Sequence, residues 1–191
     1  RVVAQAVRKE GLSAQSAPST VAAMAVKDAG SLDEFIEKAA LECLNHDPAH
    51  PALHAFEPGA ETYLSSDASV DHELLLKVQF RQPIRLSGIR IIGSTEDETA
   101  PQTVKLFQGK DHMGFEEAGD EEPVQAITFE ADQVNKGVVV PVRFVKFQCV
   151  TSLQLFFQEN FGADVTKVQR IEFIGEPAQK MDMKEFKPIK G

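Results

Sequence analysis

The sequence has 191 residues and a formal net charge of −9, is 42% hydrophobic, and contains thirteen phenylalanines, one tyrosine and no tryptophan. This length allows one domain of ordinary size together with tails. The acidic balance argues against nucleic acid as the main ligand, because neutralising phosphates requires clustered lysine and arginine, and it favours basic partner surfaces. No run of 18 apolar residues occurs, so no transmembrane helix is expected.

The first thirty residues differ in composition from the rest of the chain. Residues 1–30 are rich in alanine, serine and valine, carry four basic and two acidic side chains, and lack a sustained core pattern. We therefore expect a flexible head. The chain starts at Arg1 rather than methionine, which leaves two interpretations open: a linker within a longer protein, or the remnant of a cleaved organellar transit peptide.

One short amphipathic helix is predicted from about Leu32 to Leu44. Ser31 and Glu34 form the S-x-x-E pattern of a capping box, in which each side chain satisfies a free backbone N–H. Apolar residues then recur at helical spacing and define a face that would pack on the core. These residues are Leu32, Phe35, Ile36, Ala39 and Cys43. Cys43 is thus predicted to act as a small buried apolar residue.

After a proline-broken loop the pattern changes to strands. Apolar and polar residues alternate in short segments bounded by proline, glycine and acidic turns, and no helix is predicted between them. The segments read "ELLLKVQF", "IRLSGIRIIG", "TVKLFQG", "AITFEA", "GVVVPVRFVKFQCV", "SLQLFFQ" and "KVQRIEFIGEP". This pattern predicts an antiparallel all-β sandwich or barrel, which forms one domain over residues 31–178.

Cys149 is the one classically reactive side chain in the most apolar stretch. It alternates in phase with Val145 and Phe147, which places it on the presumed core face. A nucleophilic cysteine needs a nearby cation, histidine or helix N-terminus to lower its pKa. We therefore interpret Cys149 as a buried structural thiol. Cys43 and Cys149 form no CxxC, and we expect both thiols to be free.

Three histidines follow the predicted helix in an H-x₃-H-x₃-H pattern. On a helix, His46, His50 and His54 would share one face and could bind a metal. Pro48 and Pro51 fall within the span and disrupt a helix interior. We therefore interpret the segment as a surface loop, and predict no metal site and no cofactor.

A group of acidic residues precedes the first long strand. Asp67, Asp71 and Glu73 lack the glycine-hinged order of a calcium-binding EF-hand loop. We interpret them as residues that cap and form turns. No GxSxG, HExxH, phosphate-binding loop or dinucleotide-binding motif occurs, so the chain is predicted to be a binding module rather than an enzyme.

Several phrases, taken together and in order, resemble the proteasome-interacting thioredoxin (PITH) domain. The similarity runs from about Ser31 to Phe186. The phrases are "ECLNHDPAH", "YLSSDASVDHELLLKVQF", "IRLSGIRIIG", "VKLF", "HMGFEEA", "VRFVKFQCVTSLQLFF", "NFGADVTKVQRIEFIGEP" and "MDMKEFK". The resemblance implies a jelly-roll β-sandwich similar to galactose-binding-like domains, and a non-catalytic adaptor that docks a thioredoxin-like protein on the regulatory particle of the 26S proteasome.

The same resemblance implies that the extended basic tail, residues 179–191, is the contact segment. Its candidate partner-binding residues are Asp182, Met183, Lys184, Phe186 and Lys187. Two departures matter. The sequence has no CxxC of a thioredoxin domain, so redox activity is not carried over, and Cys149 stands where the family often has asparagine.

Two functional hypotheses therefore stand side by side. The first is a proteasome adaptor, which would be cytoplasmic and nuclear. The second is a structural or peripheral subunit of another large assembly in a plastid or mitochondrion, suggested by the serine- and alanine-rich head and the missing methionine. Sugar binding, by analogy with galactose-binding-like folds, is disfavoured because Tyr63 is the only tyrosine and no tryptophan is available as a stacking platform.

Overall fold

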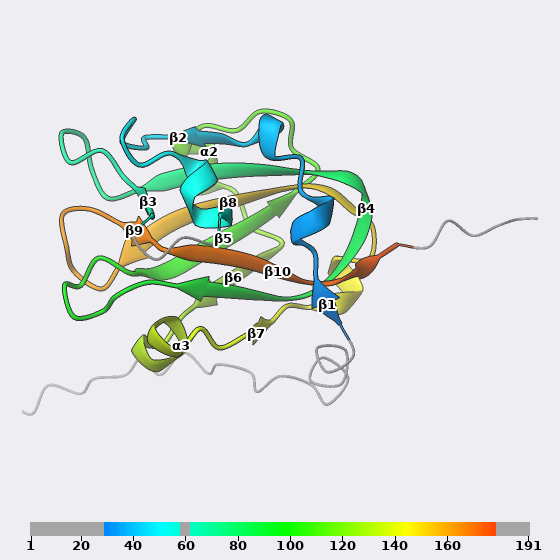
Figure 1. Ribbon diagram of the computed structural model, residues 1–191. Helices are drawn as coiled ribbons and strands as arrows, with labels where there is room; N and C mark the ends of the chain where they lie inside the picture. Colours follow the sequence, from blue (N-terminus) through cyan, green and yellow to red (C-terminus); the bar gives the residue numbers. More distant parts are fainter. Residues whose placement is uncertain (1–28, 58–61, 179–191) are drawn as a thin grey trace, which may run out of the picture.

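The structure is a computed structural model that describes residues 29–57 and 62–178 (Figure 1). Strands dominate, with short helical turns in the connections. In chain order the elements are β1 (Gly30–Ser31), η1 (Asp33–Phe35), η2 (Lys38–Ala40), β2 (Glu42–Leu44), η3 (Ala52–Phe56), β3 (Leu64–Ser65), β4 (Leu74–Ile92), β5 (Pro101–Gln108), α2 (Phe115–Asp120), β6 (Gln125–Thr128), α3 (Ala131–Lys136), β7 (Val140–Pro141), η4 (Phe144–Lys146), β8 (Val150–Asn160), β9 (Lys167–Val168) and β10 (Arg170–Pro177).

The long strand β4 belongs to both layers of the fold. Its first half pairs with β2 and β8, and its second half pairs with β10 and β7. Figure 1 shows β4 curving from one layer into the other. The ladder with β8 is interrupted between Gln79 and Ile84, where Pro83 has no backbone N–H to contribute. The two strands predicted for this region are therefore the two halves of one 19-residue strand.

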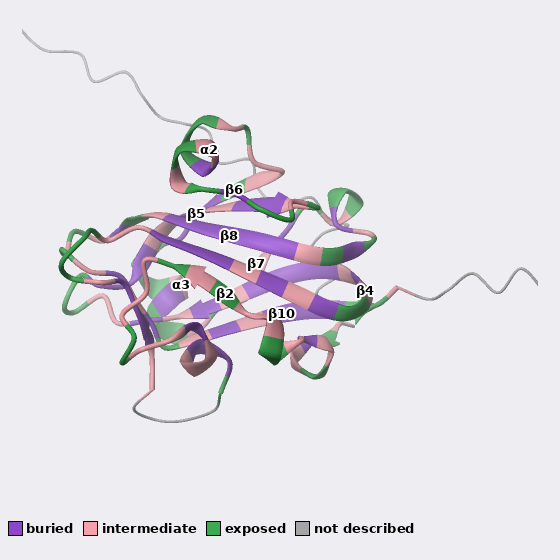
Figure 2. Cartoon of the chain, turned by 90° about the horizontal axis from the view of Figure 1, so that it is seen from above, coloured by how far each residue is buried: buried purple, intermediate pink, exposed green. Residues whose placement is uncertain are grey.

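The layers face each other across a single main core. One layer has the order β2-β4-β8-β5-β6, and the other has the order β1-β10-β4-β7. Neighbouring strands in both layers pair antiparallel. Because side chains alternate across a strand, every second residue points into the core. Figure 2 shows longer buried stretches along β4 and β8, where the outer face is covered as well. The prediction of an antiparallel all-β sandwich is confirmed.

The predicted helix from Leu32 to Leu44 is wrong. This segment forms η1, η2 and strand β2 instead. Leu32 and Ile36 are buried as predicted, but the backbone bonds to distant strands. Leu32 N–H donates to Phe173 O at 2.9 Å, and Ile36 forms an isolated bridge with Phe80.

The predicted capping box also gives way to pairing with the sheet. Ser31 is the antiparallel partner of Ile174 on β10, and its Oγ accepts a hydrogen bond from Asp33 N–H rather than from Glu34 N–H. Cys43 pairs with Leu76. The segment thus gains its hydrogen bonds from the edges of the sheet, and a helix would leave those edges uncovered.

The predicted strand through residues 143–149 is also wrong. Phe144–Lys146 form the 3₁₀ turn η4, which shifts the phase of the alternation. Phe147 is fully buried as predicted, but Val145 is 85% exposed and Cys149 is exposed. The chain must turn here to pass from β7 to β8, and it is held by a hydrogen bond from Leu86 N–H to Phe147 O.

Two short helices lie between strands where none is predicted. α2 connects β5 to β6, and α3 connects β6 to β7. At the start of α3, Gln133 Oε1 accepts a hydrogen bond from Glu130 N–H at 3.0 Å, as in a capping box. Gly137 ends the helix in the left-handed conformation, with φ 60°, which costs glycine little.

Candidate partner-binding site

The residues expected to contact a partner lie outside the described part of the chain. Asp182, Met183, Lys184, Phe186 and Lys187 all fall beyond residue 178. The described chain ends at Ala178, whose N–H donates to Pro83 O at 2.9 Å. The last described residue therefore lies where β4 crosses between the layers.

The two cysteines occupy different environments. Cys43 is partly buried against the main core, and burial raises the pKa of its thiol to about 12. Cys149, predicted to be buried, is exposed. The 3₁₀ turn that precedes it changes which residues face the core, so the prediction for Cys149 is corrected.

The three histidines hold local structure. His46 Nδ1 hydrogen-bonds to Cys43 O at 2.7 Å, and His54 Nδ1 to Tyr63 O at 3.3 Å. The ring of His50 stacks on Tyr63 with 4.1 Å between centroids. In the described ranges, no group of three or more histidine, cysteine, aspartate or glutamate side chains is placed to hold a metal ion.

Tyr63 is already engaged by its neighbours. Besides the stacked His50 ring, Lys167 Nζ lies 5.5 Å from the centroid of the tyrosine ring. A sugar platform requires a free aromatic face. The only tyrosine of the chain therefore offers less ring surface than the sequence suggests.

The acidic residues before β4 form turns, as predicted. Asp67 Oδ1 accepts hydrogen bonds from the N–H and the Oγ of Ser69, and these bonds lower the pKa of Asp67. Asp71 Oδ1 accepts from Asn45 Nδ2 at 2.8 Å and from Glu73 N–H at 2.9 Å. These carboxylates therefore stabilise the turns of the loop.

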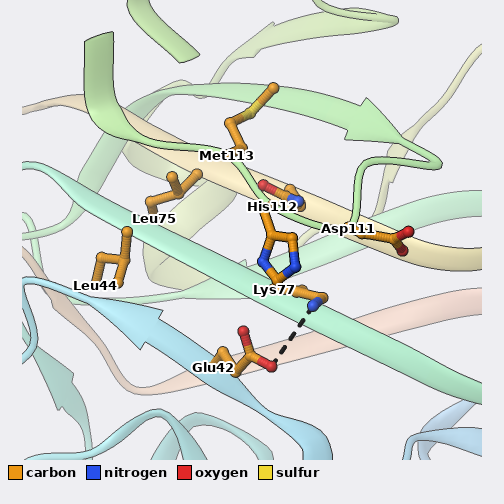
Figure 3. A pocket seen from close by; sticks show the side chains of 8 residues that line it. Glu42, Leu44, Leu75, Lys77, Asp111, His112 and Met113 are labelled. Carbon is orange, nitrogen blue, oxygen red and sulfur yellow. Dashed lines mark ion pairs between the residues drawn. The ribbon is translucent and has the colours of Figure 1, made fainter. Parts of the chain in front are cut away.

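A pocket of about 190 Å³ lies on the outer face of the β2-β4-β8 layer, under the loop of residues 109–114 (Figure 3). We call it the outer-face pocket. Its lining residues are Glu42, Leu44, Leu75, Lys77, Asp111, His112, Met113 and Gln154. None of them is a candidate from the sequence, because they come from four separate segments.

Strand alternation explains how these side chains meet. On β4, Leu74 and Leu76 point into the main core, so Leu75 and Lys77 point outward. Pairing of β2 with β4 sets Glu42 opposite Lys77 and Leu44 opposite Leu75. The edge strand therefore supplies one wall of the pocket.

A second apolar cluster closes the other side of the pocket. Helix α2 and the loop before it cover the outer face of β4, β5 and β8, and the buried residues there are Leu75, Phe107, Met113, Ala118 and Phe156. Leu75 and Met113 belong to both the cluster and the pocket. The outward phase of Phe107 and Phe156 was the sequence signal for a covered outer face.

Charged groups surround the apolar floor. Lys77 Nζ lies 3.5 Å from Glu42 Oε1, with the lysine side chain 12% exposed and the glutamate 61% exposed. Gln154 Nε2 donates to Lys110 O at 2.8 Å, which fixes the loop over the pocket. An apolar floor with a few polar groups at the rim is typical of a binding site.

The fold defines the class of this protein as a galactose-binding-like jelly-roll sandwich. It is similar to the family 32 carbohydrate-binding module of NanJ from Clostridium perfringens, solved in complex with galactose, with TM-score 0.57 and 13% identity over 76% of this chain and 98% of that one. It is also similar to the C-terminal domain of a chitobiase from Bacteroides fragilis, with TM-score 0.56 and 12% identity over 80% of this chain and 100% of that one.

Sequence similarity identifies the family within that class. The PITH domain model matches residues 22–191, and the chain belongs to the PITH domain family. The chain is 36% identical to Thioredoxin-like protein 1 of Schizosaccharomyces pombe over 80% of its own length. It is 33% and 30% identical to PITH domain-containing proteins of Drosophila melanogaster and Homo sapiens, each over 71% of its length.

The chain spans only part of these relatives. It covers 53% of the fission yeast protein and 64% of the fly and human proteins. Family membership and the thioredoxin-like relative support a protein-interaction module. Within residues 29–57 and 62–178, no helix has the length and apolarity needed to cross a membrane.

Proposed function

We propose that this chain is a non-catalytic adaptor module that docks on the regulatory particle of the 26S proteasome, as part of a thioredoxin-like protein. The observation that carries the proposal is the 36% identity to Thioredoxin-like protein 1 over 156 residues. The name of the PITH domain, a proteasome-interacting thioredoxin domain, supplies the partner. The sandwich then serves as a rigid platform, and contacts come from its surfaces and its tail.

The chemistry of the tail fits this role. The sequence "MDMKEFK" places Met183 and Phe186 three residues apart, as apolar anchors, with Lys184 and Lys187 beside them. Aromatic and methionine side chains are enriched at protein interfaces. Ala178, the last described residue before this segment, lies beside Pro83, where β4 crosses between the layers.

The direct test is cosedimentation of the whole chain with purified 26S proteasome on a density gradient. The intact chain is expected to migrate with the particle. The Lys184→Glu/Lys187→Glu double variant is expected to remain at the top of the gradient, because charge reversal removes two cations from the contact segment. The matched control is Lys136→Glu/Lys146→Glu, which reverses two exposed lysines on the sandwich and is expected to cosediment normally.

The same gradient run on a gentle cell lysate separates the adaptor from the second hypothesis. Comigration with proteasome subunits, identified by mass spectrometry, supports the adaptor and its cytoplasmic and nuclear location. Comigration with a plastid or mitochondrial complex would instead make the chain a subunit of that assembly. Residues 1–30 would then be the first segment to delete.

A further inference from the structure

We propose that the outer-face pocket is a second docking site, which receives one apolar side chain from a lysine- or arginine-rich segment of a partner protein. The inference rests on the proposed role as a protein-interaction module, and it adds a surface and a partner chemistry that the tail does not supply. Three features support the inference: the size of the pocket, the charge around it, and the backbone hydrogen bonds at the edge strand β2.

The apolar part of the pocket has room for one large side chain. Leu75 and Met113 form the floor, with 3% and 9% of their surface exposed, and Leu44 stands at the rim with 47% exposed. The volume is about 190 Å³, and a cavity of about 150 Å³ is large enough to hold a benzene molecule. A leucine, methionine or phenylalanine side chain therefore fits and would cover Leu44.

The surroundings of the pocket select a basic partner. Residues 109–122, which form the loop over the pocket and α2, contain six acidic residues and one lysine. The acidic residues are Asp111, Glu116, Glu117, Asp120, Glu121 and Glu122. Lys110 pairs with Glu117 at 3.3 Å and with Glu121 at 2.8 Å. The exposed acidic residues that Lys110 does not contact can therefore attract cations from a partner.

The lysines on the neighbouring strands, Lys77 and Lys105, are already engaged, since Lys105 Nζ donates to Ala118 O at 3.4 Å and to Gly119 O at 2.9 Å. Lys77 lies against Glu42 and is 12% exposed, so it presents little positive charge to a ligand. An acidic partner would meet the carboxylates of Glu42 and Asp111 at the rim. The negative charge around the pocket thus favours lysine and arginine in the partner segment.

The edge strand β2 directs the partner toward side-chain contacts. Among the described strands, β2 pairs with β4 alone, and open edges often accept an added strand. Here part of the backbone at that edge is engaged: Cys43 O bonds to His46 Nδ1, and just after the strand Asn45 O accepts from Asp67 N–H. The partner segment therefore anchors through the pocket and the acidic flank rather than by extending the sheet.

The test begins with a phage-displayed library of random peptides, selected on the purified whole chain. Enriched peptides are expected to combine one leucine, methionine or phenylalanine with flanking lysine or arginine. A synthetic copy of the consensus is then titrated by fluorescence anisotropy. Leu44→Lys is expected to weaken its binding about tenfold, because this substitution places a cation at the apolar rim. Asp111→Asn is expected to weaken it about threefold and to reduce its dependence on salt.

Matched variants control for general effects of mutation. Val70→Lys changes another exposed apolar residue, 66% exposed in the loop before β4. Asp164→Asn removes another exposed carboxylate, in the loop after β8. Both are expected to bind the consensus peptide within about twofold of the wild type, as distant surface changes usually do.

Four results would overturn the proposal. They are selection of acidic peptides or of none, equal losses in the control variants, stronger binding by a free peptide of residues 180–191, and a self-association that Leu44→Lys abolishes. The third result would make the tail of the chain the occupant, and the fourth a second copy. Each result can be told apart from a failure of the proposed function, because proteasome cosedimentation is a separate experiment. It is measured for Leu44→Lys as well as for the tail variant.

Discussion

Gly175 on β10 lies against the backbone of Arg85 on β4 so closely that a β-carbon at position 175 would stand 2.0 Å from the Arg85 carbonyl oxygen. The approach occurs at an irregularity in the ladder. Ile174 pairs with Gly88, and the next residue, Gly175, pairs with Leu86, which leaves Ser87 without a partner on β10. The extra residue of this irregularity is therefore Ser87.

Replacement of Gly175 by alanine is expected to lower the free energy of unfolding by about 2 to 3 kcal/mol, because backbone must shift to admit the methyl group. Urea denaturation measures the change. The control is Gly30→Ala, since Gly30 is the partner of Gly175 on β1 and nothing lies within 4 Å of a β-carbon placed there. An equal loss in both variants would contradict the steric explanation.

The two thiols are expected to react at different rates in the native protein. Cys149 is exposed, and burial raises the pKa of Cys43 to about 12, so the reactive thiolate of Cys43 is scarce near neutral pH. Titration with a chromogenic disulfide reagent should therefore release about one equivalent from the native chain and about two in denaturant.

Single substitutions assign the two equivalents. Cys149→Ser should abolish the fast native reaction, and Cys43→Ser should leave it unchanged. Because the pKa of Cys43 is raised by folding, its contribution to stability is present below its unfolded pKa, near 9.0, and is lost as the pH rises toward 12. Fast modification of Cys43 in the native state would contradict its burial.

The sequence predicts the sheet well wherever strand residues alternate without interruption. Leu153, Leu155 and Phe157 are fully buried, as the period-2 pattern requires. The pattern fails at Leu32 to Leu44, where apolar residues at helical spacing reach the core from turns bonded to β4 and β10. Their backbone partners lie 31 or more residues away in the sequence, and a local pattern carries no information about them.

The candidate site is predicted only in part for the same reason. The alternation that includes Val145 and Cys149 ends at a turn whose position depends on the path between β7 and β8. The outer-face pocket depends on the register of β2 against β4 and on the fold of the loop above it. The outward phase of Phe107 and Phe156, which are 3% and 1% exposed, is the local sign that the outer face carries a cover.

Truncating a buried apolar side chain is expected to lower the free energy of unfolding far more than truncating an exposed one. Phe173 is fully buried and contacts Phe80 edge-to-face at 5.5 Å and Phe56 at 6.2 Å between centroids. Phe173→Ala is expected to lower the free energy of unfolding by about 3 to 5 kcal/mol, since it leaves a cavity between the layers. Val145→Ala, at a position 85% exposed, is expected to change it by less than about 0.5 kcal/mol. Thermal and urea denaturation of both variants compare them directly, and a large loss at Val145 would place it in the core after all.

A pH-dependent contribution to stability is expected from Asp33, at the start of η1. Its carboxylate pairs with Arg170, which also contacts Glu172 Oε1 at 3.3 Å. Burial raises the pKa of Asp33 above its ordinary value of 3.8, and Glu172 adds to the rise, while Arg170 opposes it. Burial therefore outweighs the ion pair.

The sign of the effect follows from the proton count. As the pH rises from 3.8 through the raised pKa, the native protein keeps a proton on Asp33 that the unfolded chain has already lost, so the free energy of unfolding falls. Asp33→Asn has no such group. Urea denaturation of both proteins between about pH 3 and pH 7 should show the stability of the wild type declining relative to the variant as the pH rises through this window, and then holding a constant difference. A wild type that instead gains stability over the variant in the same window would mean that attraction to Arg170 outweighs burial of the Asp33 carboxylate.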